Sequence, residues 1–284
     1  MAERCPLCGS PEATERFRAG EARLLGCPGC GLGRLEALPS AEELAARYGE
    51  ADVCTDREGV FKEMELYRQR FSARLREMSR HAARGRLLDV GCSVGYFVRL
   101  ASEAGWEAEG QDIARRAAAV GRSAFDVKIS VGSLRELAFP GDSFDAVTMW
   151  HVIEHLPDPV GEIAEVSRIL RRGGLLAIET PDAGSRAARS RKERWHYFKP
   201  EQHLFYYSLR PLSALLGRHG FEILARRSVG GTGFAAGLRR AGAGGAAEKL
   251  VALARKLATL RRAVVGLRGI MGLNDALLVY ARKR

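Results

Sequence analysis

The segment 86–101 constrains the fold of this chain more than any other part of the sequence. Apolar residues lead into a turn of small residues, and a helical pattern follows the turn. The turn holds Gly91, Ser93 and Gly95, whose small side chains leave the backbone accessible. A strand, a glycine turn and a helix in this order let backbone N–H groups approach a nucleoside closely. The segment therefore predicts a nucleoside-binding unit of an α/β sheet.

Asp112 supports this prediction. It follows Gly91 by 21 residues and ends the next strand-like run, 106–111, where a carboxylate can bind ribose hydroxyls. A dinucleotide turn of the form Gly-x-Gly-x-x-Gly would place a third glycine at position 96, where Tyr96 stands. The alternative to a nucleoside site is a turn whose glycines are needed only for the backbone conformation.

Four of the six cysteines form two Cys-x-x-Cys pairs near the N-terminus, namely Cys5, Cys8, Cys27 and Cys30. Two such turns can supply four thiolates to one tetrahedral zinc ion. Redox or disulfide motifs are the alternative, but a redox Cys-x-x-Cys usually occurs singly. Because four thiolates leave no open position, the zinc is expected to be structural, and we expect a zinc ribbon over residues 1–36.

The rest of the chain alternates between strand and helix patterns, as in a parallel α/β sheet. A helix is expected to begin at Ser40, and an amphipathic helix is expected over 61–81, so that 37–84 forms a helical linker or lid. Residues 85–284 form the nucleoside-binding domain. We expect strands near 86–91, 106–111, 127–131, 144–150, 174–180, 221–229 and 275–283, and helices near 95–104, 114–123 and 158–171.

The net charge of +11 is concentrated in one segment. Residues 232–270 hold eight basic residues and one acidic residue, so this segment contributes +7 of the net charge. Leucines at helical spacing predict a basic amphipathic helical insertion there, packed on its own domain, on a partner subunit, or on anionic lipid through residues 246–269. No run of 18 apolar residues and no signal-peptide pattern occurs, so the expectation is a cytoplasmic protein, either free or peripheral to the membrane.

Several motifs, in order, resemble class I S-adenosylmethionine (SAM)-dependent methyltransferases, in particular the methyltransferase-23 or UbiE/UbiG-like group. The matching segments are Leu88–Gly95, Gly110–Ile113, Phe139–Asp145, Trp150–Pro159 and Arg172–Pro181. The resemblance implies a Rossmann-like fold, with a mostly parallel seven-stranded sheet whose last strand is antiparallel. It also implies SAM as the cofactor.

The resemblance implies a set of SAM-binding residues. They are Asp89, Gly91, Ser93, Gly95, Asp112, Ile113, Ser133, Leu134 and Trp150. The glycine turn would hold the methionine end, Asp112 the ribose, and Ile113 with Ser133 the adenine. The sequence departs from the family pattern at Ser93, which replaces a glycine, and at Ser133, which replaces a frequent acidic residue.

Two histidines are candidate catalytic residues. His155 ends a His-x-x-Glu-His pattern, which also occurs in zinc proteases, but a strand pattern leads into it and prolines follow it. In the methyltransferase interpretation it faces SAM or the acceptor, or it only caps the next helix. His203 lies in an aromatic-rich loop, 195–208, and is the preferred general base, with His155 second and His196 third.

These features predict O-methylation of a small molecule, a glycan precursor or a quinone-like lipid. An N-terminal four-cysteine ribbon resembles that of sugar C-methyltransferases, but their large C-terminal domain is missing here. The alternatives are an RNA methyltransferase that grips RNA with the ribbon and basic segment, and a non-catalytic zinc-ribbon scaffold. A nucleic-acid partner is not expected, because 151–154 lacks the Asn/Asp-Pro-Pro-aromatic pattern of exocyclic-amine enzymes.

Overall fold

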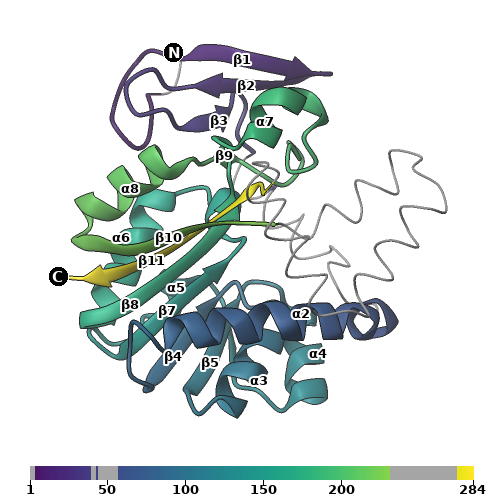
Figure 1. Ribbon diagram of the computed structural model, residues 1–284, viewed down its shortest axis with the longest axis vertical. Helices are drawn as coiled ribbons and strands as arrows, with labels where there is room; N and C mark the ends of the chain where they lie inside the picture. The colour runs from purple at the N-terminus through teal and green to yellow at the C-terminus, as the bar shows by residue number, and fades with distance from the viewer. Residues whose placement is uncertain (1–3, 40–42, 44–56, 231–273) are drawn as a thin grey trace. The chain divides into compact units, whose positions relative to one another are not determined.

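The computed structural model describes residues 4–39, 43, 57–230 and 274–284 (Figure 1). Contacts group the chain into two compact units. The first comprises Met1–Ala37, Thr180–Leu212 and Arg227–Leu278, and the second Leu38–Glu179, Ser213–Arg226 and Val279–Arg284. The predicted domains 1–36, 37–84 and 85–284 stay a prediction; contacts group the segment 180–212 with the N-terminal residues 1–37. The physical reason is a strand that this segment adds to the ribbon sheet.

The first unit contains a four-stranded sheet in the order β1-β2-β3-β9. Its strands are β1 (Thr14–Ala19), β2 (Ala22–Gly26), β3 (Gly33–Leu35) and β9 (Phe205–Tyr206). β3 pairs antiparallel with β9, and Gly33 lies opposite Tyr206. A Cβ atom at Gly33 would lie 2.9 Å from the Cβ atom of Tyr206, so only glycine permits this close pairing. The unit also holds α7 (Arg186–Arg191) and the 3₁₀ turn η2 (Lys192–Arg194).

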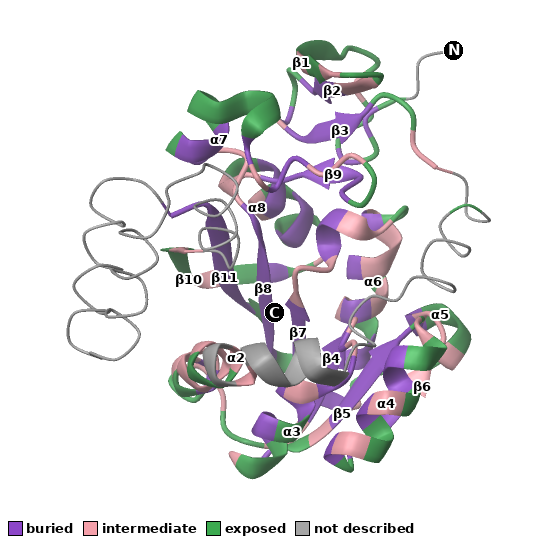
Figure 2. Cartoon of the chain, turned by 90° about the vertical axis from the view of Figure 1, so that its right-hand side faces the viewer, coloured by how far each residue is buried: buried purple, intermediate pink, exposed green. Residues whose placement is uncertain are grey.

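A seven-stranded sheet forms the centre of the second unit, in the order β10-β11-β8-β7-β4-β5-β6. Its strands are β4 (Arg86–Val90), β5 (Glu107–Asp112), β6 (Ile129–Val131), β7 (Phe144–Trp150), β8 (Leu170–Pro181), β10 (Phe221–Val229) and β11 (Ala276–Lys283). The pairs from β6 to β8 are parallel, and the last strand is antiparallel. Most residues of β4 and β7 are buried (Figure 2). The predicted mostly parallel seven-stranded sheet is confirmed.

The order of the strands places a switch point between β4 and β7. From β4 the chain continues outward to β5 and β6, and it then returns to pair β7 with the other edge of β4. Ligands of open α/β sheets bind outside the carboxyl ends of the strands at such a point. The end of β4 leads into the glycine turn, which therefore lies at the expected binding position.

The helices of the second unit include α2 (Arg57–Met78), α3 (Tyr96–Glu103), α4 (Arg115–Phe125), α5 (Leu134–Leu137) and α6 (Pro159–Ile169), with the 3₁₀ turn η1 (Ile153–His155) before α6. Of these, α2, α3, α4 and α6 follow the predicted pattern, whereas the short α5 was not predicted. A further helix, α8 (Leu209–Arg218), precedes β10 and was not predicted. α2 packs against α3, as Figure 1 shows.

Some predictions concern residues outside the described ranges. These are the helix that would begin at Ser40, the helical insertion at 232–270 and its membrane contact through 246–269. Among the helices that the structure describes, none combines the length and the apolar character that crossing a bilayer requires.

Candidate functional site

The turn after β4 has a left-handed backbone at three positions. The φ angles of Gly91, Ser93 and Gly95 are +65°, +51° and +70°. One carboxylate holds this turn in place: the Ser93 N–H donates to Oδ2 of Asp112 at 2.6 Å, and the Ala114 N–H donates to Oδ1 at 2.8 Å. Asp112 therefore joins the turn to the end of β5, in addition to its predicted ribose contact.

Asp112 is well buried, with 8% of its surface exposed. Burial raises the pKa of the Asp112 carboxyl, and the hydrogen bonds from the backbone N–H groups of Ala114 and Ser93 oppose this rise. Each carboxylate oxygen has two lone pairs, so both oxygens can accept a further hydrogen bond. A ribose diol can therefore bind Asp112 without displacing the turn.

The surroundings of Gly91 and Gly95 leave no room for a side chain. A Cβ atom on Gly91 would lie 2.7 Å from Cγ2 of Val152, and one on Gly95 would lie 2.8 Å from Cγ2 of Val127. Val152 follows the end of β7, so the glycine at position 91 lets the ends of β4 and β7 approach each other. Both glycines therefore serve packing as well as backbone geometry.

Replacement of Gly95 by alanine is expected to lower the free energy of unfolding by about 2–5 kcal/mol. The left-handed backbone contributes about 1–2 kcal/mol and the crowded Cβ atom about 1–3 kcal/mol. Gly173→Ala is the matched control, because Gly173 has φ +75° and no atom of the described residues near its Cβ position. Urea unfolding measures both variants. Equal losses of unfolding free energy in the two variants would show that crowding of the Cβ atom is not the cause.

Asp89 lies inside the sheet. It is 2% exposed, and Oγ1 of Thr148 on β7 lies 2.6 Å from its Oδ1. Burial raises the pKa of Asp89 to about 8, although the Thr148 hydrogen bond opposes this shift. The carboxyl is therefore mostly protonated at neutral pH, and it links β4 to β7 without burying a full charge. A direct contact of Asp89 with SAM stays a prediction.

Gln111 is a site residue that the sequence reasoning missed. It is buried in β5, where its Nε2 donates to the carbonyl oxygen of Gly132 and its Oε1 accepts from the Gly91 N–H at 3.3 Å. One side chain thus joins the glycine turn to the loop predicted to hold adenine. Gln111 lies in the matching segment Gly110–Ile113, but the motif gave it no role of its own, because the two partners come from different loops.

The predicted adenine-side residues differ in their surroundings. Ile113 is 48% exposed and is the one exposed large apolar side chain of the part of the chain that the structure describes. An apolar surface of this kind suits a contact with a planar base. Ser133 forms a capping box with Glu136: its N–H donates to Oε2 at 2.7 Å, and its hydroxyl donates to the same oxygen at 2.8 Å. Leu134 is fully buried, and the contacts of Ser133 and Leu134 with adenine stay predictions.

Trp150 ends β7 beside an aromatic cluster. Its ring centroid lies 5.0 Å from that of Phe97 and 6.3 Å from that of Phe71, which belongs to α2. Within the described ranges its buried indole N–H has no hydrogen-bond acceptor. A buried donor without an acceptor is costly unless a ligand or water supplies one. This orphaned donor is compatible with a bound polar ligand near the end of β7.

A buried charged cluster joins α2 to the ends of β7 and β8. Nε of Arg74 lies 2.9 Å from Oε2 of Glu179, and Arg70 contacts the other carboxylate oxygen. A nitrogen of Arg70 is 2.9 Å from Nε2 of His151, whose Nδ1 lies 3.2 Å from Oε1 of Glu154. Burial alone would raise the pKa of Glu179, but Arg70, His151 and Arg74 hold it well below its usual value. The sequence reasoning missed this cluster, since α2 and β8 lie far apart in the chain.

Glu179→Gln is expected to lower the free energy of unfolding at pH 7 by about 3–5 kcal/mol, because it leaves Arg70 and Arg74 without their carboxylate. A carboxyl whose pKa is lowered in the folded state stabilises the fold at pH values above the ordinary pKa of Glu. This contribution to the free energy of unfolding is lost as the pH falls through the pKa of the folded state. The difference from the parent should therefore shrink below about pH 4. Unfolding curves across pH measure this. Glu103→Gln, which breaks the exposed pair with Arg99, should cost under about 0.5 kcal/mol.

The candidate histidines lie in both units. His155 ends η1 in the second unit, is about one-quarter exposed, and has its Nε2 4.0 Å from Oε1 of Glu154. His203 belongs to the first unit and is buried, with its Nδ1 2.7 Å from the carbonyl oxygen of Tyr197. His196 lies in the first unit, with its Nδ1 3.3 Å from Oδ2 of Asp275.

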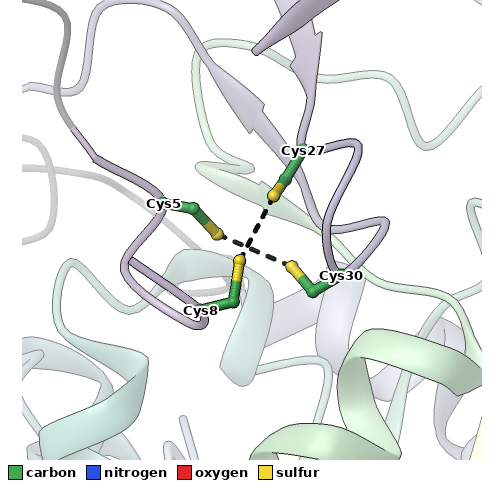
Figure 3. Close-up of side chains that lie close together, drawn as sticks. All are labelled: Cys5, Cys8, Cys27 and Cys30. Carbon is green, nitrogen blue, oxygen red and sulfur yellow. Dashed lines mark hydrogen bonds between the residues drawn. The ribbon is translucent and has the colours of Figure 1, made fainter. Parts of the chain in front are cut away.

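The four cysteines of the ribbon converge on one point (Figure 3). The two turns are built alike: the Gly9 N–H donates to the carbonyl oxygen of Cys5 and the Gly31 N–H to the carbonyl oxygen of Cys27, each at 2.8 Å. The sulfur atoms of Cys5 and Cys30 are 3.6 Å apart, and those of Cys8 and Cys27 are 3.4 Å apart. Tetrahedral zinc with Zn–S bonds of about 2.3 Å needs sulfur separations of about 3.8 Å. The donor set and its spacing therefore fit a zinc ion.

The chain matches a known protein family. The methyltransferase-23 family model, which describes a methyltransferase domain, matches residues 57–226, more than half of the chain. This range contains the glycine turn, Asp112 and the buried charged cluster.

Individual relatives agree with this match. A probable SAM-dependent methyltransferase of Mycolicibacterium smegmatis is 33% identical over 150 residues, which cover 51% of this chain and 54% of that protein. A ubiquinone biosynthesis O-methyltransferase of Xanthomonas campestris is 36% identical over 102 residues, which cover 34% of this chain and 42% of that protein. The chain thus spans about half the length of the curated relatives it matches.

Solved structures show the same fold. The crystal structure of a SAM-dependent methyltransferase from Archaeoglobus fulgidus matches with a TM-score of 0.55 at 20% identity, over 80% of this chain and 100% of that chain. Identity at this level shows the fold alone. Together with the family match, it shows that the chain belongs to the methyltransferase-23 family and carries a domain of the class I SAM-dependent methyltransferase fold.

Proposed function

We propose that this protein is a SAM-dependent O-methyltransferase whose acceptor is a hydroxyl of a small molecule, a glycan precursor or a quinone-like lipid. The observation that carries the proposal is the glycine turn at the switch point of the sheet, tied by two hydrogen bonds to Asp112. The match to a ubiquinone biosynthesis O-methyltransferase supports a hydroxyl acceptor. The acceptor class and the methylated atom are part of the proposal.

The residues around the turn suit SAM. Gly91, Ser93 and Gly95 keep the backbone accessible for the methionine end, and Asp112 can bind the ribose diol. The exposed side chain of Ile113 offers an apolar surface to adenine. When bound, SAM supplies an electrophilic methyl group, and the residues of the chain orient it and exclude water.

We assign the role of general base to His203, ahead of His155. Its Nδ1 lies 2.7 Å from the carbonyl oxygen of Tyr197, an acceptor that only a protonated Nδ1 can satisfy. In the neutral imidazole the basic lone pair is then on Nε2, which could accept the proton of an acceptor hydroxyl. Two tyrosine rings, of Tyr197 and Tyr206, lie 6.3 Å and 6.2 Å from the His203 ring and hold it in place.

His203→Gln is expected to lower kcat by about 100-fold or more with little change in the affinity for SAM, because general-base catalysis contributes about 10²–10⁴-fold. The pH–rate profile of the variant should lose its acidic limb. His155→Gln provides the comparison. Loss of the acidic limb in His155→Gln, with an intact profile in His203→Gln, would assign the base to His155 instead.

We also propose that Cys5, Cys8, Cys27 and Cys30 bind a structural zinc ion. The support is the convergence of four sulfur donors at separations close to those of a tetrahedral site. A closed four-thiolate set leaves no position for a substrate, so the ion would stabilise the ribbon and take no part in methyl transfer. The small ribbon buries little apolar surface by itself, which makes a metal an effective source of stability.

Transfer of a labelled methyl group tests the proposed function. The protein is incubated with methyl-labelled SAM and a cell extract separated into lipid, small polar molecules with glycans, RNA and protein. Label in the lipid or small-molecule fraction, absent with Asp112→Ala, is the expected result. Nuclease-sensitive label would replace the proposal with an RNA methyltransferase. No transfer, together with no binding of S-adenosylhomocysteine, would leave a non-catalytic scaffold.

A further inference from the structure

The first unit contains a cavity of about 180 Å³, and none of the residues that line it is assigned to SAM binding or to proton transfer. It is lined by two residues of the ribbon strand β1 and by residues of α7, η2 and β9. The residues that matter chemically are Arg16, Phe17, Arg189, Lys192, Trp195 and Tyr206. Three of them are cations and three are aromatic, and no acidic side chain is among the residues that line the cavity.

Opposite charges act on two of the cavity's cations: Asp182 on Arg189, and Cys27 with Cys30 on Arg16. Arg16 and Arg189 are each anchored by one hydrogen bond to a backbone carbonyl, of Gly31 at 2.8 Å and of Gly184 at 2.6 Å. Within the described part of the chain, neither these arginines nor Lys192 forms an ion pair with a carboxylate. A guanidinium has five N–H donors, so each arginine keeps donors for a ligand. The lining of the cavity therefore carries three cations and no carboxylate.

Trp195 adds a buried donor to the same cavity. Its side chain is 3% exposed, and its indole N–H has no acceptor among the residues that the structure describes. The Trp195 ring lies 6.5 Å from the ring of Tyr206. A native fold seldom leaves a buried donor unsatisfied, so a ligand or an ordered water that brings an acceptor would satisfy the indole N–H of this lining residue. The aromatic rings offer apolar faces to the body of that ligand.

We propose that this cavity is a binding site for a phosphate ester of a small ring compound. A phosphate monoester carries a charge of about −1.5 to −2 at pH 7 and three acceptor oxygens, which matches several cations and an indole donor better than a single carboxylate does. The rings of Phe17, Trp195 and Tyr206 contact the ring of the ester. This inference does not rest on the proposed function, because phosphate-ester binding needs neither SAM nor the His203 base, although Tyr206 also lies beside His203.

NMR of the indole N–H groups tests the proposal on the full chain with zinc bound. The sequence has three tryptophans, Trp106, Trp150 and Trp195, so three indole signals are expected, and Trp195→Phe assigns one of them. Titration with phenyl phosphate should shift the Trp195 signal downfield, as a new hydrogen bond requires, and leave the other two in place. Phenol, which has the ring without the phosphate, should not shift it. An unmoved Trp195 signal at millimolar phenyl phosphate would overturn the proposal.

Matched variants separate a built site from a generally basic surface. Arg189→Gln and Lys192→Gln should each raise the Kd for phenyl phosphate by about 10-fold, because each removes a charge-assisted contact. Arg191→Gln and Arg194→Gln remove equal charges from the same exposed segment but not from the cavity lining, and should change the Kd by less than about 2-fold. Equal weakening in all four variants would show nonspecific attraction and would contradict a defined site. The dispersion of the NMR spectrum reports that each variant is folded.

Discussion

Asp112→Ala lowers the affinity for SAM by at least about 100-fold. The variant loses a carboxylate that can accept two ribose hydroxyls, and hydrogen bonds to charged groups contribute about 1.5–3 kcal/mol each. It also removes the acceptor of the Ser93 and Ala114 N–H groups, so the glycine turn loses its attachment to β5. Calorimetric titration with SAM measures the Kd, and transfer of the labelled methyl group should fall in parallel at subsaturating SAM.

Two further variants define the cause of this loss. Asp112→Asn keeps one carbonyl oxygen and should give an intermediate Kd. Glu107→Gln lies at the other end of β5, where the carboxylate is exposed, and should bind SAM with unchanged affinity. If Asp112→Ala and Glu107→Gln bound SAM equally well, Asp112 would be a structural residue only and the ribose assignment would be wrong.

Removal of one ribbon thiolate should abolish stoichiometric zinc binding. Cys8→Ser leaves three sulfur donors, whereas the binding free energy of structural zinc sites, about 10–16 kcal/mol, depends on a complete donor set. Elemental analysis should find one zinc ion per parent chain and much less than one per variant chain. Hydrogen exchange should show that the amides of β1, β2 and β3 lose protection, because the proposed ion would join the two turns that flank this small sheet.

Cys92→Ala is the matched control for this experiment. Cys92 is a buried cysteine of the second unit that packs against Val98 and Ala117, outside the four-cysteine cluster. It should retain one zinc ion per chain and normal protection in the ribbon. A full zinc content in Cys8→Ser, or a parent protein that binds no zinc after refolding with excess metal, would contradict the proposed site.

Local patterns predicted the parts of the site that depend on short stretches of chain. The glycine turn and the four-cysteine set follow from backbone geometry and ligand spacing over a few residues. The capping box of Ser133 and Glu136 also has a local signature, Ser-x-x-Glu, which the sequence reasoning passed over because it considered Ser133 only as an adenine contact. The helix α8 was not predicted, because the aromatic-rich segment before it was interpreted only as a loop.

Contacts between distant segments could not be predicted in the same way. Arg74 and Glu179 are separated by 105 positions, and neither belongs to a motif that names the other. Gln111 connects two loops through one side chain, and any polar residue of a strand would look the same in sequence. The pairing of Gly33 with Tyr206, which joins the segment 180–212 to the ribbon, depends on a strand of only two residues.

The sequence by itself thus determined the family of the fold, the position of the glycine turn and the identity of the four clustered cysteines, since period, turn chemistry and residue spacing are local properties. Only the tertiary structure decided which side chains complete these sites. It brought Arg70 and Arg74 to Glu179, and it formed the basic and aromatic cavity beside Trp195. The reason is physical: the energy of a buried ion pair or an orphaned donor depends on distances between segments that are far apart in the chain. These distances are set only when the segments pack together.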